Sequence, residues 1–347
     1  MDKNSLLTKL SAILHNDAEI SLLKFITRTG DAEQLVDSIN SFCMAHFNNH
    51  VSDCHFAHTS MGASFGLRLE NGKDIFLKIS RLRSEAFGNR GHSVHELTAM
   101  SHLQEALHKT GYPCPAVILH PIKYNGAIYT VNEYADIGKQ ENAHNPIIRQ
   151  ASAHGLAELI KRINPPVNLD GFKEVDIYKI ENIYPAPHNP NTDFSRNAEE
   201  AGWIDEIAIK FKKLIRSIEK NVVMGHCDWS MKNMRIADNK IAMVYDWDSI
   251  ILQDEYHILA TAAKNYNMTW DIPVRIIPTQ EESYDYVVLY EQVREKKFTK
   301  KEWTKIAACI TYLFCYTARC QVSAGDEYKG SFIEALSNMK GGNYLCV

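Results

Sequence analysis

The sequence predicts an α+β protein with a β-rich first part and a larger, mainly helical second part. Three short segments between Cys54 and Ser80 alternate apolar and polar residues, as half-buried strands do. After Asp136 most apolar residues instead recur near the helical period of 3.6. Strands and helices therefore occupy separate stretches of the chain, and the regular alternation of parallel α/β folds is missing.

The first 50 residues are predicted to be helical. Segments 5–14 and 32–47 repeat apolar residues at the helical period, and residues 1–20 are expected to form an amphipathic helix. Lys, Ser, His and Asn interrupt the apolar positions of residues 1–20, so no secretory signal is expected. We expect a helical leader over residues 1–50 that either covers the strands or supports a dimer.

Residues 51–135 are expected to form a strand-rich domain with one helix. Segments 54–60, 64–70 and 73–80 predict three strands, and Asn71 followed by Gly72 predicts a hairpin turn between the last two. A helix over 94–111 should end at Gly111. Segments 116–122 and 127–135 predict a second strand pair, and the domain boundary is expected near 134–138.

Residues 136–347 are expected to form the larger domain. Helices are predicted at 147–163 and 199–220, and a short strand pair at 233–238 and 240–247. Further helices should follow. The apolar segment 306–318 is too short for a membrane span of about 20 residues and indicates a buried helix.

Net charge and cysteine spacing limit the partners and the compartment that we expect. The net charge is −4, and the most basic stretch, residues 294–301, is typical of a solvated helix end, so no nucleic-acid partner is expected. The eight cysteines show neither CxxC pairs nor zinc-finger spacing, which favours a reducing compartment. We therefore expect a cytoplasmic protein without a membrane partner.

One acidic cluster stands out between residues 222 and 250. Phosphoryl transfer needs a carboxylate near the attacking hydroxyl and hard oxygen ligands for Mg²⁺. Asn233 and Asp246 can supply metal ligands, and the predicted strand pair would bring them together. Asp228 precedes Asn233 by five residues and can face the hydroxyl. The structural alternative is that all these are ordinary turn residues around a hairpin.

Two motifs in this cluster resemble those of the aminoglycoside phosphotransferase and choline kinase family. HCDWSMKN resembles its H-G-D-x-x-x-x-N loop, with Cys227 in place of Gly, and VYDWDS resembles its I-D-W-[DE] motif. The resemblance implies a bilobal protein-kinase-like fold with ATP and Mg²⁺ as cofactors. It implies that Asp228 is the catalytic carboxylate, that Asn233 and Asp246 bind the metal, and that Asp248 assists a second metal. His226 is expected to support the loop.

Kinase chemistry also requires a phosphate-binding lysine on the third strand and a glutamate on the next helix. Lys78 lies in the third predicted strand and Glu96 opens the helix that follows. Glu85 competes with Glu96 for this role, and both residues are also compatible with ordinary surface positions.

A glycine-rich loop over the phosphates is expected between the first two strands. It contains the candidate nucleotide-binding residues Gly62, Ser64 and Gly66. The segment after the fifth strand should act as a hinge, where Glu133 and Ala135 offer backbone groups to adenine. A simple linker is the alternative interpretation of that segment.

Three other functions remain in view. Residues 62–66 also fit G-x-S-x-G with Ser64 as a hydrolase nucleophile, but a hairpin follows where that motif needs a helix. A pseudokinase or regulator would bind nucleotide without transfer, although degenerate members usually lose a residue of the set retained here. A protein kinase usually carries D-F-G and A-P-E, and neither occurs.

The substrate is expected to be a small-molecule alcohol. Residues 250–295 contain eight acidic and three basic residues, and Glu281, Glu282, Asp285 and Glu291 alternate with tyrosines. Such a surface suits an amine-bearing ligand such as an aminoglycoside-like antibiotic, and an ordinary solvated helix face is the alternative. Trp229 and Trp247 should pack beneath the site or edge a pocket. Monomer and homodimer both remain open.

One further departure concerns the segment after the metal motif. The family often shows G-D-P-x-x-D-L-A there, whereas QDEYHILA has Ile258 at the second Asp. This departure weakens a typical aminoglycoside assignment more than it weakens the kinase prediction.

Overall fold

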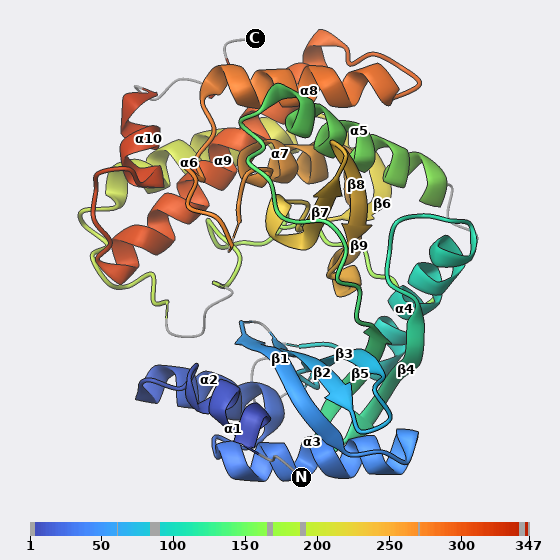
Figure 1. Ribbon diagram of the computed structural model, residues 1–347. Helices are drawn as coiled ribbons and strands as arrows, with labels where there is room; N and C mark the ends of the chain where they lie inside the picture. The colour runs from blue at the N-terminus through green and yellow to red at the C-terminus, as the bar shows by residue number, and fades with distance from the viewer. Residues whose placement is uncertain are drawn as a thin grey trace. The chain divides into compact units, whose positions relative to one another are not determined.

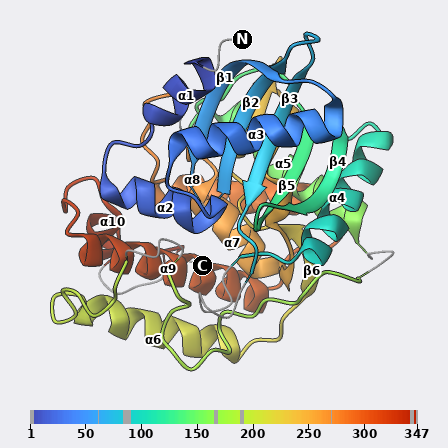
Figure 2. The same cartoon turned by 90° about the horizontal axis from the view of Figure 1, so that it is seen from below.

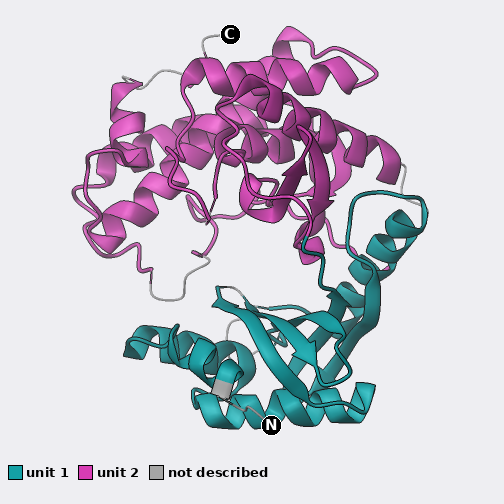
Figure 3. Ribbon diagram, in the orientation of Figure 1, with its two compact units in different colours: residues 1–136 teal, residues 137–347 magenta. Residues whose placement is uncertain are grey.

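The computed structural model describes residues 4–60, 62–83, 91–164, 169–187, 192–269, 271–339 and 344–345. The chain divides into two compact units, residues 1–136 and 137–347 (Figures 1 and 3). The division falls within the stretch where the sequence places a domain boundary. The helical leader lies in the same unit as the strands.

The leader consists of α1 (Asn4–Ser11), α2 (Asp17–Thr27) and α3 (Ala32–Phe47). The expected continuous helix over residues 1–20 is wrong, because α1 ends at Ser11 and Asn16 starts a new helix. The Asn16 side chain accepts hydrogen bonds from the backbone N–H groups of Ala18 and Glu19. Such a cap satisfies donors that a helix start leaves open.

Unit 1 contains a five-stranded antiparallel sheet, as the sequence predicts. The strands are β1 (Val51–Thr59), β2 (Gly62–Leu69), β3 (Asp74–Ser80), β4 (Val117–Tyr124) and β5 (Ala127–Glu133), in the spatial order β1-β2-β3-β5-β4. Helix α4 (Val94–Lys109) connects β3 to β4. These two strands are not neighbours, because β5 lies between them in the sheet. Ser93 and Glu96 form a capping box at the start of α4.

The two faces of this sheet differ in character. On β3, Ile75, Leu77 and Ile79 are fully buried in a core shared with the leader helices. Figure 2 shows α3 lying across the strands. Phe76 and Lys78 alternate with these residues and are only partly buried. Burial of each aliphatic side chain stabilises the unit by about 1.5–3 kcal/mol, so the leader is a major part of its core.

Unit 2 contains two short antiparallel strand pairs. The predicted pair is β7 (Met234–Ala237) and β8 (Lys240–Val244), joined by Asp238 and Asn239 at φ 50° and 60°. Two consecutive positive φ values are typical of a tight hairpin turn. The second pair, β6 (Val222–His226) with β9 (Ile250–Asp254), brings the two ends of the acidic segment together.

Helices form the rest of unit 2 around a long central helix. They are α5 (Pro146–Ile163), α6 (Gly202–Arg216), α7 (Glu255–Asn265), α8 (Gln280–Val293), α9 (Lys300–Ala324) and α10 (Phe332–Asn338). Helix α9 packs against α6, α7 and α10, and its apolar segment is buried as expected. None of the helices in the described residues combines the length and apolar character needed to cross a membrane.

Candidate functional site

A buried histidine anchors the loop between β6 and β7. His226 is fully buried at the end of β6. Its Nε2 donates to the Tyr245 carbonyl at 3.0 Å, and its Nδ1 accepts from the Asp228 backbone N–H at 3.2 Å. One ring therefore connects the backbone of Asp228 with the residue that precedes Asp246. The structure confirms that His226 supports the loop.

Two buried tryptophans pack against this histidine. Trp229 is 1% exposed and Trp247 is 5% exposed. Their ring centroids lie 5.7 Å and 6.3 Å from that of His226. The Trp229 indole N–H donates to the Ser152 carbonyl at 2.9 Å, which attaches the loop to α5. Both tryptophans therefore pack under the loop.

The Asp228 carboxylate is held through one of its oxygens. Oδ2 lies 2.7 Å from Lys232 Nζ and accepts from Asn233 Nδ2 at 3.0 Å. Asn233 Nδ2 also donates to the Asp228 carbonyl at 2.8 Å. Within the described parts of the chain, Asp228 Oδ1 and Asn233 Oδ1 have no hydrogen-bond partner. The loop thus fixes the two side chains and leaves one oxygen of each for a ligand.

Asp246 has a left-handed backbone conformation, which is uncommon among residues other than glycine. Its φ and ψ are 64° and 45°, in the left-handed region. This region costs a non-glycine residue about 1 kcal/mol, and such strain gathers at functional sites. Ser249 holds the turn: its Oγ donates to Asp246 Oδ2 at 2.8 Å and its N–H to the Asp246 carbonyl at 2.9 Å. The Tyr245 N–H donates to the Asn233 carbonyl at 2.9 Å, which ties both metal-ligand candidates together.

Three acidic side chains of this segment act on Cys227 through their charge. Burial, followed by the charges of Asp228, Asp246 and Asp248, raises the pKa of the Cys227 thiol to about 12. The thiol is therefore protonated at neutral pH. The Cys227 N–H donates to the Ser249 carbonyl at 2.9 Å, so this residue also joins the two motifs. The negative charges of this segment create a field that favours a bound cation.

The donor set fits a magnesium ion. Mg²⁺ prefers oxygen ligands and usually takes only one or two carboxylates or amides from a protein. Asn233 supplies an amide oxygen that has no partner among the residues that the structure describes, and Asp246 supplies a carboxylate held by Ser249. Asp248 lies in the short 3-10 helix η3 (Trp247–Ser249) and is partly buried. The sequence interpretation missed Lys232 and Ser249, although the spacing of Lys232 four residues after Asp228 was a usable signal.

In unit 1, Lys78 lies in the middle of the sheet. It faces Ser64 of β2 on one side and Thr130 of β5 on the other, across paired strands. Glu96 is buried at the third position of α4, where Arg83 NH1 lies 2.7 Å from its Oε1. The ion pair of Lys78 with Glu96 stays a prediction. Glu85, the competing glutamate, lies outside the described residues.

The expected glycine-rich loop is shorter than the sequence suggests. Gly62, Ser64 and Gly66 all lie within β2, and only residues 60 and 61 separate β1 from β2. A Cβ at Gly66 would lie 2.7 Å from the rings of both Phe56 and Tyr134, so close packing explains this glycine. Ser64 lies in an antiparallel hairpin, which rules out the strand-turn-helix geometry of a hydrolase elbow. The phosphate-binding role of the three residues stays a prediction.

The expected hinge follows the last strand of unit 1. Glu133 ends β5, and its N–H donates to the Ala116 carbonyl at 2.8 Å. Tyr134 stacks on His55 with the ring centroids 4.9 Å apart. The backbone roles assigned to Glu133 and Ala135 stay predictions.

The acidic surface expected on α8 is largely used within the protein. Glu282 lies 2.6 Å from His144 Nδ1 and 3.0 Å from Arg275 NH2. Asp285 lies 3.3 Å from Arg149 NH2. Arg275 and Arg149 already neutralise half of the four acids that the sequence interpretation singled out for an amine ligand. The surface of α8 therefore gives weaker support to a cationic substrate than the sequence suggests.

No protein-family model matches the sequence, and no curated protein matches it. Solved structures do match across most of the chain. An amicoumacin kinase solved with AMP-PNP and Ca²⁺ has a TM-score of 0.60 at 12% identity, covering 84% of this chain and 90% of that one. A spectinomycin phosphotransferase solved with AMP has a TM-score of 0.56 at 13% identity, covering 87% and 98%.

A third similar structure is a thermostable aminoglycoside phosphotransferase mutant solved with AMP-PNP and hygromycin B. Its TM-score is 0.56 at 11% identity, and the match covers 88% of this chain and 100% of that one. Identities this low establish the fold alone. The chain has the kinase-like fold of these enzymes, with a five-stranded antiparallel sheet followed by a mostly helical part.

Proposed function

We propose that this chain, which has the fold of the aminoglycoside phosphotransferases, is a Mg²⁺- and ATP-dependent phosphotransferase acting on a hydroxyl of a small molecule. The observation that carries the proposal is the pair of oxygens, Asp228 Oδ1 and Asn233 Oδ1, without partners in the described residues. They belong to side chains fixed within one loop, beside a strained Asp246. Ordinary turn residues would not need this arrangement.

Asp228 would act on the acceptor hydroxyl. Its Oδ2 is occupied by Lys232 and Asn233, so Oδ1 is the atom that would accept the hydroxyl proton. As the proton moves to Oδ1, the acceptor oxygen forms a bond to the γ-phosphorus and the bond from that phosphorus to the ADP oxygen breaks. Lys232 and Asn233 fix the plane of the carboxylate, which is the positioning that this reaction requires.

Asn233 and Asp246 would hold Mg²⁺, with Asp248 assisting a second ion. A bound Mg²⁺ would neutralise phosphate charge and orient the transferred group. The residues of this chain supply the frame: Asp228 orients the Asn233 amide, and Ser249 orients the Asp246 carboxylate.

Unit 1 would contribute the nucleotide-binding residues. Lys78, supported by Glu96, would bind phosphates. The backbone of β2 near Gly62, Ser64 and Gly66 would approach the same phosphates, and Glu133 with Ala135 would contact adenine. The support for these roles is the position of Lys78 on the third strand of a sheet whose fold matches nucleotide-bound structures.

The acceptor is proposed only as a class. The similar solved structures are described as an amicoumacin kinase, a spectinomycin phosphotransferase and an aminoglycoside phosphotransferase bound to hygromycin B. Aminoglycoside-like antibiotics and other amine-bearing alcohols are therefore the first compounds to test. The seven described cysteines are free thiols, which suits the reducing cytoplasm.

The test is ATP turnover by the full chain with Mg²⁺ across aminoglycosides, choline, ethanolamine and other amino alcohols. Turnover stimulated by one compound would establish the kinase and its substrate class. A parallel titration measures nucleotide affinity with and without Mg²⁺, in the wild type and in Asp246→Asn. We expect the Mg²⁺ dependence to be lost in this variant, because a carboxylate ligand becomes an amide.

Two other outcomes distinguish the alternatives. Mg²⁺-dependent nucleotide binding without turnover on any compound would favour a pseudokinase or regulator. If no nucleotide binds, the proposed function is wrong.

A further inference from the structure

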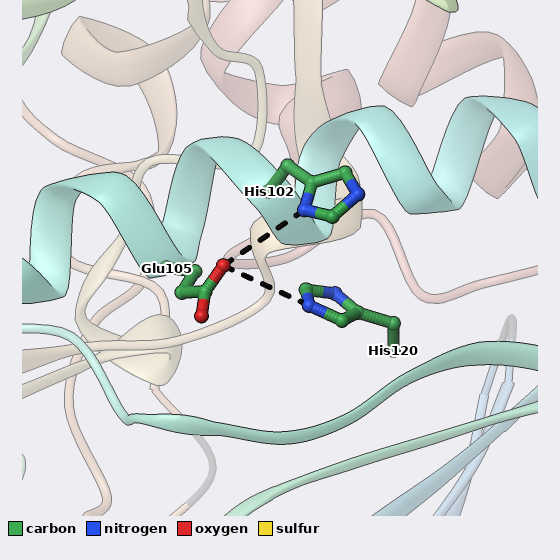
Figure 4. A group of neighbouring side chains, drawn as sticks. All are labelled: His102, Glu105 and His120. Atoms are coloured by element: carbon green, nitrogen blue, oxygen red, sulfur yellow. Dashed lines mark ion pairs between the residues drawn. The ribbon is translucent and has the colours of Figure 1, made fainter.

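A group of potential metal ligands lies on unit 1 and includes none of the residues assigned to nucleotide binding. His102 and Glu105 come from α4 and His120 from β4 (Figure 4). Glu105 Oε2 lies 3.9 Å from His102 Nδ1 and 3.7 Å from His120 Nε2. The two imidazole centroids are 4.3 Å apart. Figure 4 shows the carboxylate turned toward both rings.

Neighbouring side chains orient two of the three ligands. Ser101 Oγ lies 2.9 Å from His120 Nδ1, so a proton on Nδ1 would bond to the hydroxyl and leave Nε2 as a lone pair toward Glu105. Lys109 Nζ lies 2.9 Å from Glu105 Oε1, which leaves Oε2 for the histidines. Metal-binding histidines commonly have such a partner on the second ring nitrogen.

We propose that His102, Glu105 and His120 form a Zn²⁺ site that links α4 to β4. Two imidazoles and one carboxylate are a known zinc ligand set, with a water in the fourth position. Ligands about 2.1 Å from a tetrahedral zinc lie about 3.4 Å from one another. The three ligand atoms lie within 4.8 Å of one another. Side-chain movements of about 1 Å or less would therefore close the site.

The site would add a metal link between two elements that already meet through packing and the Ser101–His120 contact. His102 and Glu105 lie in the second half of α4, and Glu96 lies in its first turn. A metal bound to both α4 and β4 would fix the helix against the sheet. Because only the folded unit brings the three ligands together, Zn²⁺ should also stabilise the fold.

The rival explanation is a surface ion-pair network around Glu105 that binds no metal. Titration of ZnCl₂ into the metal-free full chain, in competition with a chromophoric chelator and with excess Mg²⁺, separates the two. The proposal predicts one tight site per chain and an increase in melting temperature with Zn²⁺. Both effects should disappear in His120→Gln and in Glu105→Gln, whose far-UV circular dichroism without metal should match the wild type.

Three further variants make the test specific. Ser101→Ala should weaken Zn²⁺ binding about 10–100-fold, the usual effect of losing a partner that orients a ligand. His95→Ala removes an exposed histidine about two turns earlier on α4 and should leave affinity unchanged. Asp246→Asn should also retain the site, which excludes zinc binding at the acidic cluster of unit 2.

Two results would overturn the proposal. One is the absence of a stoichiometric Zn²⁺ site in the wild type. The other is a site whose affinity is the same in His120→Gln and Glu105→Gln as in the wild type.

Discussion

The properties of Asp228 follow from the few atoms around its carboxylate. Lys232 and Asn233 both contact Oδ2, and the His226 ring accepts a hydrogen bond from the Asp228 backbone N–H. These contacts restrict the rotation of the carboxylate, and Oδ1 is the oxygen left without a partner in the described residues. A surface aspartate in a turn would gain nothing from three separate restraints, whereas a proton acceptor in phosphoryl transfer requires them.

Asp228→Asn should reduce turnover by about 10²–10⁴-fold while nucleotide affinity stays near the wild-type value. The amide keeps the size of the side chain but cannot accept the proton. Steady-state kinetics with an accepting compound, together with nucleotide titration, measure the two effects. The matched control is Asp238→Asn on the exposed β7–β8 turn, where φ is 50° and asparagine is well tolerated. Equal turnover in the two variants would remove Asp228 from the mechanism.

A second prediction at this scale concerns pH. Burial lowers the pKa of His257 to about 4, against about 6.5 in an unfolded chain. Between these values the unfolded chain binds a proton that the folded chain excludes. The unfolding free energy should therefore fall as pH drops from about 6.5 to 4, by up to about 1.4 kcal/mol per pH unit from this residue.

His257→Gln should make that pH dependence shallower. All five tryptophans lie after residue 200, so tryptophan fluorescence during urea unfolding reports on unit 2. His15→Gln, at an exposed position of unit 1, is the control. An unchanged slope in His257→Gln would show that the buried imidazole does not couple to folding.

At the scale of elements, unit 2 begins with a segment bound to β7. Lys139 and Ile236 exchange backbone hydrogen bonds at 3.1 Å and 2.8 Å, so residue 139 extends the β7–β8 pair. Gly138 precedes this contact at φ 66°, and a Cβ there would lie 2.6 Å from the Ile236 carbonyl oxygen. Because Asn233 immediately precedes β7, the segment helps to hold the strand that follows the loop with Asp228 and Asn233.

Gly138→Ala should destabilise unit 2 through both the positive φ and the clash with backbone. Gly325→Ala is the matched control, because Gly325 has φ 76° but open space around it. We expect Gly138→Ala to cost about 1–3 kcal/mol more than the control, as overpacking usually does. Urea unfolding followed by tryptophan fluorescence measures the difference. Equal costs would mean that Ile236 moves aside without loss.

The elements also show what the sequence could predict. The β7–β8 hairpin is local, and its two-residue turn has residues that tolerate positive φ, so pattern alone was sufficient. The β6–β9 pair joins segments on either side of that hairpin, and no local signal specifies such a pairing. The glycines of β2 suggested a loop, whereas Gly66 is required by the rings of Phe56 and Tyr134. Such tertiary packing is not visible in the order of residues.

Some residues of the candidate site could be predicted from the sequence, and others could not. Asp228, Asn233 and Asp246 were identifiable because their spacing is that of a known motif. Ser249 was missed because its contact with Asp246 arises only in the fold, whereas Lys232 was missed although it follows Asp228 by four residues. Ile258, which departs from the family pattern, is fully buried against Gly225 and belongs to the core of unit 2.

At the scale of the molecule, the stability of unit 2 depends on a buried charge pair. Lys305 of α9 and Asp254, which ends β9 and caps α7, are 2% and 4% exposed and lie 2.6 Å apart. Lys305 Nζ also donates to the carbonyls of Ile218 and Glu219, at 2.9 Å and 3.0 Å. The Lys305 ammonium group therefore connects α9 with the segment before β6 and with the end of β9.

Lys305→Met should lower the unfolding free energy of unit 2 by about 3–5 kcal/mol, because it leaves the Asp254 carboxylate buried without its cation. Lys301→Met, on an exposed position one turn earlier in α9, is the control and should change stability by less than about 0.5 kcal/mol. Urea unfolding monitored by tryptophan fluorescence compares the two. A similar small effect in both variants would show that the pair adds nothing to stability.

The most direct test of the central claim is phosphorus NMR of the full chain with ATP, Mg²⁺ and the panel of amine-bearing alcohols. The proposed function predicts a new phosphomonoester resonance that grows as ATP is converted to ADP, and that is nearly absent with Asp228→Asn. ATP that remains unchanged with every compound, in a chain that also fails to bind nucleotide, would contradict it.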